Sequence, residues 1–110
     1  MKVSGTCHCG QISFEAEIDP GQVRICHCTD CQKLTGSAFR TNVASLPGTF
    51  RFNSGTPLYA AAPEANPSTV GLRVGALDQR SELRPVRQGW CRSALPWSMD
   101  ITALPRAERQ

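Results

Sequence analysis

The sequence predicts a single, mainly β domain, and three observations support this prediction. The chain has 110 residues, which is within the usual size of one domain and too short for two hydrophobic cores. Residues 11–18, QISFEAEI, alternate apolar and polar side chains, as a strand with one buried face does. No window of about 10 residues keeps a helical period, and eight prolines and nine glycines interrupt the chain.

The other expected elements are short. Residues 22–28, QVRICHC, follow the turn DPGQ, so this segment and residues 11–18 are expected to form a β-hairpin. Residues 48–53 place Phe50 and Phe52 on one face, and residues 69–77, TVGLRVGAL, alternate again. Residues 29–36, TDCQKLTG, form the one helix-like stretch, with Thr29 or Asp30 as its cap and Gly36 at its end.

Charge and hydropathy indicate neither a nucleic-acid partner nor a membrane. Lysine and arginine number 12 against 9 acidic residues, and they are spread along the chain, which argues against a nucleic-acid-binding surface. The start, MKVSGTCHCG, lacks the apolar run of a signal peptide, and no window has the roughly 18 apolar residues of a membrane span. We therefore expect a soluble, cytoplasmic protein that binds neither nucleic acid nor membrane; no feature of the sequence indicates its oligomeric state.

The strongest chemical signal is ICHCTDC, residues 25–31, which holds three cysteines and a histidine in seven positions. In a reducing compartment, cysteines this close are metal ligands or catalytic thiols more often than disulfides. On a strand, Cys26 and Cys28 point to the same side while His27 faces away, and Cys31 returns through the following turn. Three thiolates favour zinc and leave one tetrahedral position, which a structural site closes with protein and a catalytic site keeps for water or substrate.

The remaining cysteines and histidines give weaker signals. Cys7 and Cys9, in a second CHC triplet, offer only two ligands. Cys91 stands alone and is expected to be a small buried residue rather than a ligand. His8 and His27 each lie between two cysteines, so we expect them at the surface or in a supporting role rather than on the metal.

Four segments carry a family resemblance: GTCHCGQISFEAE from residue 5, ICHCTDCQKLTGSAF from residue 25, VGALD from residue 74, and LPW from residue 95. In this order they resemble the glutathione-dependent formaldehyde-activating enzyme family, also called the centromere-protein-V-like family. The resemblance implies several small antiparallel sheets around two zinc sites. Cys7 and Cys9 match half of a structural site that a later C-x-x-C pair completes. Cys26, Cys28 and Cys31 match a three-cysteine site held to be catalytic.

The chain departs from the family pattern after TFRF. The family has a strand with the C-x-x-C pair before VGALD, whereas this chain continues as NSGTPLYAAAPEANPST. We expect SGTP to be joined directly to LYAAA near residues 54–58, with roughly two dozen residues absent by analogy with the family. Either the deletion is real, and Cys7 and Cys9 lack their partners, or the natural chain carries a segment absent from this sequence.

Three thiolates also restrict the chemistry of a zinc ion. The site carries a net charge near −1, which weakens zinc as a Lewis acid and suits it to bind a further thiol. The resemblance names that thiol as glutathione and its electrophile as formaldehyde, which gives S-hydroxymethylglutathione. Because this addition also proceeds without an enzyme, the wider class of carbon–sulfur lyase on a thiol adduct is the safer expectation. The alternatives are a non-enzymatic zinc-stapled β binding module, with Cys7 or Cys9 as fourth ligand, and a redox sensor.

The expected substrate pocket follows the third cysteine. Gly36 and Ser37 are expected to line the open zinc position, where glycine permits close approach and the hydroxyl can meet a polar substrate. A helix stop and a turn explain the same two residues equally well. Trp97 is a weaker pocket candidate, because a tryptophan in such a position is more often part of the core.

Intact mass spectrometry tests the apparent gap. Two lost ligands and one or more lost strands would remove much of the stability of a small zinc domain, because metal affinity becomes folding free energy. We therefore expect the folded protein to be clearly heavier than 12.0 kDa. A mass near 12.0 kDa would mean that the deletion is real and that Cys7 and Cys9 form no complete structural site.

Overall fold

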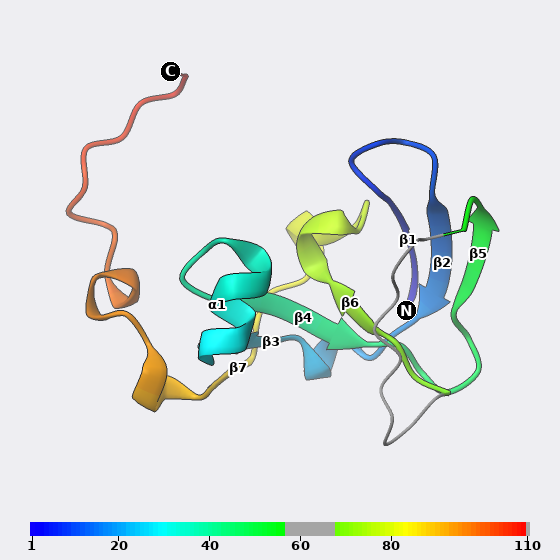
Figure 1. The fold of residues 1–110 in the computed structure, drawn as a ribbon, viewed down its shortest axis with the longest axis horizontal. Helices are drawn as coiled ribbons and strands as arrows, with labels where there is room; N and C mark the ends of the chain where they lie inside the picture. The colour runs from blue at the N-terminus through cyan, green and yellow to red at the C-terminus, as the bar shows by residue number, and fades with distance from the viewer. Residues whose placement is uncertain (57–67, 110) are drawn as a thin grey trace.

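The computed structural model of this chain describes residues 1–56 and 68–109. This part contains seven short strands, one α-helix and several 3₁₀ turns, arranged in two small sheets (Figure 1). The prediction of a mainly β fold with small sheets is confirmed. Within residues 54–58, the expected join of SGTP to LYAAA lies between residues 57 and 58, outside the described residues, so it stays a prediction.

The first sheet is antiparallel and contains the clearest strand of the sequence. Its order is β1 (Lys2–Thr6), β2 (Ser13–Glu17) and β5 (Arg51–Ser54). The apolar face of β2 packs inward as the alternation predicts, with Ala16 buried and the Phe14 ring 5.6 Å from that of Phe50. Phe50 and Phe52 share a face, with ring centroids 5.0 Å apart.

The second sheet has four strands in the order β6 (Gly71–Arg73), β4 (Arg40–Ala44), β3 (Arg24–Cys26) and β7 (Arg87–Gly89). Its β3–β7 pair is parallel and its other pairs are antiparallel. Helix α1 (Thr29–Thr35) follows β3 directly, and Figure 1 shows it beside β4. The 3₁₀ turns are η1 (Pro20–Gln22), η2 (Val74–Ala76), η3 (Arg80–Glu82), η4 (Cys91–Ser93) and η5 (Pro96–Met99).

Two local expectations were wrong because they ignored pairing between distant segments. The segments before and after DPGQ do not form a hairpin: β2 pairs with β1 and β5, whereas β3 pairs with β4 and β7. Between them, the Asp19 side chain accepts a hydrogen bond from the Gly21 N–H and starts η1, which redirects the chain. The alternation over residues 69–77 is a strand only at Gly71–Arg73, and the chain then coils into η2.

The two sheets share one hydrophobic core, which packs them against each other. Isolated bridges join Gly5 of β1 to Leu77 after η2, and Ile18 after β2 to Ser45 after β4, and thereby connect the two sheets. The buried apolar side chains are Val3, Ala16, Ile18, Val23, Val43, Leu72, Val74, Leu77 and Leu83. Beyond η5 the chain leaves this core as an extended segment (Figure 1). In the part of the chain that the structure describes, no helix has the length and apolar character that crossing a membrane requires.

The contact at Gly5 gives a test of this packing. A Cβ at position 5 would overlap the Phe14 ring and lie 2.5 Å from the backbone oxygen of Ala76, which cannot rotate away. We expect Gly5→Ala to lower the free energy of unfolding by about 1–3 kcal/mol, the usual cost of overpacking. Denaturant unfolding of this variant and of the wild type measures the difference.

Gly75→Ala is the matched control, because a Cβ at position 75 meets nothing within 4 Å. Its free energy of unfolding should stay close to that of the wild type. Equal stability of Gly5→Ala and the wild type would contradict the close approach of β1 to η2.

Candidate metal centre

The structure brings together the three cysteines that the sequence singled out. The Sγ atoms of Cys26, Cys28 and Cys31 all lie within 4.8 Å of one another. Tetrahedral zinc with Zn–S bonds of about 2.3 Å needs sulfurs roughly 3.8 Å apart, which small side-chain rotations supply from this arrangement. The donor set therefore fits a zinc ion.

Strand geometry sets the directions of the first two cysteines. Cys26 ends β3, paired with Arg40 on β4 and Gly89 on β7, and the His27 N–H continues this ladder by donating to the Gly89 carbonyl at 3.0 Å. His27 therefore points to the side opposite the thiols. Its ring is 1% exposed, and its Nε2 lies 2.8 Å from Oε1 of Gln88. This confirms that His27 faces away from the cysteines but places it inside the protein, in a supporting position.

The start of helix α1 fixes the third cysteine. The N-cap is Cys28, not Thr29 or Asp30 as expected: its Sγ accepts a hydrogen bond from the Cys31 N–H at 3.3 Å. This backbone donor lowers the pKa of the Cys28 thiol from its ordinary value. One helical turn thus places Cys31 beside Cys28, and the cap favours the thiolate that a metal requires.

Cys31 is buried, and an arginine compensates for its burial. Burial raises the pKa of the Cys31 thiol to about 11, while Arg40 acts in the opposite direction. The Nε and Nη2 atoms of Arg40 donate to Cys31 Sγ at 3.2 and 2.8 Å. No local pattern predicted a role for Arg40, because its approach to Cys31 depends on the β3–β4 register that pairs Arg40 with Cys26.

A glutamine ties the cysteine turn to the second sheet. Gln32 Nε2 donates to the His27 carbonyl at 2.8 Å and to the Ser93 carbonyl at 2.9 Å. These bonds join α1, the end of β3 and η4, so the turn between Cys26 and Cys31 is supported from three elements. A supported turn keeps the thiols converged before a metal binds.

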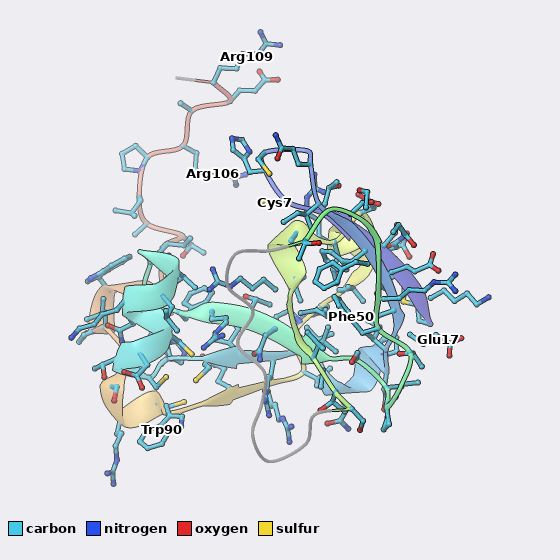
Figure 2. The ribbon with its side chains drawn as sticks, turned by 45° about the vertical axis from the view of Figure 1, so that its right-hand side comes forward. Cys7, Glu17, Phe50, Trp90, Arg106 and Arg109 are labelled. Carbon is cyan, nitrogen blue, oxygen red and sulfur yellow. The ribbon has the colours of Figure 1, made fainter. Side chains whose placement is uncertain are left out.

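Cys7 and Cys9 form a separate pair. They lie exposed on the β1–β2 loop, which stands apart from helix α1 (Figure 2). Hydrogen bonds from the Gln11 backbone and from the Cys7 side chain lower the pKa of the Cys9 thiol from its ordinary value. Among residues 1–56 and 68–109, the group of three metal-type ligands contains neither of them. Their role in a structural zinc site stays a prediction.

The weaker site candidates lie at the surface. Gly36 and Ser37 are exposed at the C-terminal end of α1, where Gly36 ends the helix as expected with φ of 62°. Trp97, in η5, is 63% exposed and so is not a core residue. Cys91 was expected to be buried, but it is exposed at the start of η4.

Comparisons with known proteins agree with this architecture. Residues 2–66, more than half of the chain, match the family model described as glutathione-dependent formaldehyde-activating enzyme. A crystal structure of a Rhodobacter sphaeroides protein from structural genomics is similar in fold, with a TM-score of 0.58 and 21% identity. The similarity covers 77% of this chain and 98% of the other. No curated protein is significantly similar to the chain.

Substitution of a single thiol tests the metal centre. Cys28→Ser removes one soft ligand, but serine is itself a good N-cap, so helix α1 should still form. We expect the variant to lose stoichiometric zinc, measured by metal analysis after dialysis, while the wild type retains it.

Cys91→Ser is the matched control, since Cys91 is exposed and outside the three-cysteine group. This variant should bind zinc like the wild type. Stoichiometric zinc in Cys28→Ser with unchanged sulfur coordination would refute the assignment of the ligands.

Proposed function

Because the chain belongs to the glutathione-dependent formaldehyde-activating enzyme family, we propose that it is a zinc-dependent carbon–sulfur lyase acting on glutathione or a related thiol adduct. The reaction proposed is the reversible formation of S-hydroxymethylglutathione from glutathione and formaldehyde. The single observation that carries the proposal is a group of three converging thiols without a fourth metal-type ligand among the described residues.

The open position suits a thiol substrate. Cys26, Cys28 and Cys31 would hold the zinc, and bound zinc would supply a site that favours the deprotonated form of a fourth sulfur. In the reaction, the glutathione sulfur forms a bond to the formaldehyde carbon, the carbonyl π electrons move to oxygen, and that oxygen takes up the proton released by the thiol. Atoms and charge balance without a redox partner.

The residues around the thiols contribute charge and position. Arg40 places a positive guanidinium against Cys31 and so reduces the repulsion between neighbouring thiolates. Gln32 fixes the backbone between Cys26 and α1 through two carbonyls. Preorganisation of this kind lets a substrate sulfur enter without rearrangement of the protein ligands.

A non-enzymatic zinc-stapled module is the second candidate function. It requires a fourth protein ligand, and Cys7 or Cys9 was the expected donor. Among the described residues, neither Cys7 nor Cys9 belongs to the three-cysteine group, which favours the enzyme over the zinc-stapled module.

Either function requires reduced thiols, which agrees with the expected cytoplasmic location. The assignment of Gly36, Ser37 and Trp97 to the substrate pocket remains part of the proposal.

Cobalt substitution tests the open position directly. We expect glutathione to strengthen the sulfur-to-metal charge-transfer absorption of the cobalt(II)-loaded protein, because a fourth thiolate joins the metal. S-methylglutathione, which has no ionisable thiol, should leave that absorption unchanged.

Exchange spectroscopy with ¹³C-formaldehyde then tests the reaction. The zinc-loaded protein should accelerate exchange between formaldehyde and S-hydroxymethylglutathione, and Cys28→Ser should not. An unchanged cobalt spectrum together with exchange at the uncatalysed rate would contradict the proposed activity.

A further inference from the structure

A polar cavity lies beside the cysteine cluster. Its volume is about 720 Å³, within the range of small-molecule sites. It is an open cavity lined by the start of the β1–β2 loop, the end of α1, strands β4 and β6, and the segment from η2 to η3. Cys7, labelled in Figure 2, lies on the β1–β2 loop and lines this cavity.

The charges that line the cavity are mainly positive. Arg40, Arg73 and Arg80 face it, and Asp78 is the acidic residue among its lining side chains. Asp78 is already engaged, since its Oδ2 accepts a hydrogen bond from the Ser4 hydroxyl at 2.6 Å. Within residues 1–56 and 68–109, the ion pair that the structure records joins Arg51 to Glu15, so no carboxylate of that part neutralises the three guanidinium groups.

Each guanidinium keeps donors for a ligand. Arg73 donates through Nη1 to the Leu34 carbonyl at 3.4 Å, and Arg80 donates through Nη1 to the Leu77 carbonyl at 3.3 Å. These bonds use one nitrogen of each guanidinium. The remaining N–H groups suit the planar, two-oxygen shape of a carboxylate.

Arg40 connects the cavity to the thiols. It lines the cavity and also donates to Cys31 Sγ through Nε and Nη2. A ligand in the cavity is therefore separated from the cysteine cluster by one guanidinium. A peptide chain spans about 3.5 Å per residue, so a cysteine-containing peptide can place its sulfur at the cluster and a carboxylate beyond Arg40.

We propose that this cavity is the carboxylate-recognition subsite for the peptide-thiol substrate, with Arg73 and Arg80 as its specificity-determining residues. The inference rests on the proposed function for the identity of the thiol. Glutathione is a tripeptide with two carboxylates, and the lining arginines exceed the lining acids by two, from three arginines and one aspartate. The subsite distinguishes glutathione from uncharged thiols of similar reactivity.

The test separates carboxylate binding from metal binding. S-methylglutathione has both carboxylates of glutathione but no ionisable thiol. Its dimethyl ester has neither carboxylate and no ionisable thiol. By calorimetric titration of the zinc-loaded protein, we expect S-methylglutathione to bind and the ester to bind at least about 10-fold more weakly. Arg73→Gln and Arg80→Gln should each weaken S-methylglutathione about 10-fold, the loss that corresponds to one charged hydrogen-bonding contact, and should leave ester binding unchanged.

Arg84→Gln is the matched control, because it removes the same charge from an exposed arginine outside the cavity lining. Its affinity for S-methylglutathione should equal that of the wild type, and circular dichroism should show all three variants folded. The inference is overturned if the acid and the ester bind alike, if the cavity variants bind like Arg84→Gln, or if the wild type fails to bind S-methylglutathione at millimolar concentration.

The two proposals can fail separately. If glutathione changes the cobalt spectrum while Arg73→Gln and Arg80→Gln lose no affinity, the subsite is wrong and the proposed activity stands. If S-methylglutathione binding depends on both arginines but glutathione leaves the cobalt spectrum unchanged, the subsite stands and the thiol-activating function fails.

Discussion

The convergence of three thiols is the constraint on which the rest of the site depends. Thiolates this close repel one another, so they persist only where donors and positive charge surround them. The chain supplies the Cys31 N–H to Cys28 and the Arg40 guanidinium to Cys31. A metal ion bound by the three thiols would complete the compensation, and binding would displace the proton that burial favours on Cys31, whose pKa is raised.

The fold serves this convergence through a central strand. Strand β3 lies between β4 and β7, so Cys26 is held by two neighbours, and the buried His27 anchors the opposite side of the same turn. Gln32 then joins the turn to η4. The shared core packs the two sheets together, and the η2–η3 segment lines the same cavity as Arg40.

Local patterns in the sequence predicted the parts of the site that depend on local geometry. The spacing of Cys26 and Cys28 was enough to direct both thiols to one side and His27 to the other, because neighbouring strand residues alternate. The helix after them and its end at Gly36 follow from equally local signals. The cap was missed because cysteine is not among the usual N-cap residues.

Features that depend on distant pairing could not be predicted in this way. The expected hairpin around DPGQ failed because β3 pairs with β4 and with β7, some sixty residues later, for example through Ile25 and Gln88. The contact between Arg40 and Cys31 could not be predicted for the same reason, since only the β3–β4 register brings Arg40 to the thiols. The exposure of Cys91 follows from the course of η4 at the surface, which its isolated position in the sequence does not reveal.

X-ray absorption spectroscopy of the zinc-loaded protein distinguishes an open zinc site from a closed one. We expect three sulfur ligands and one oxygen or nitrogen ligand in the absence of glutathione, and four sulfur ligands after glutathione is added. Four sulfur ligands before glutathione is added, unchanged by its addition, would show a closed structural site and refute the open position.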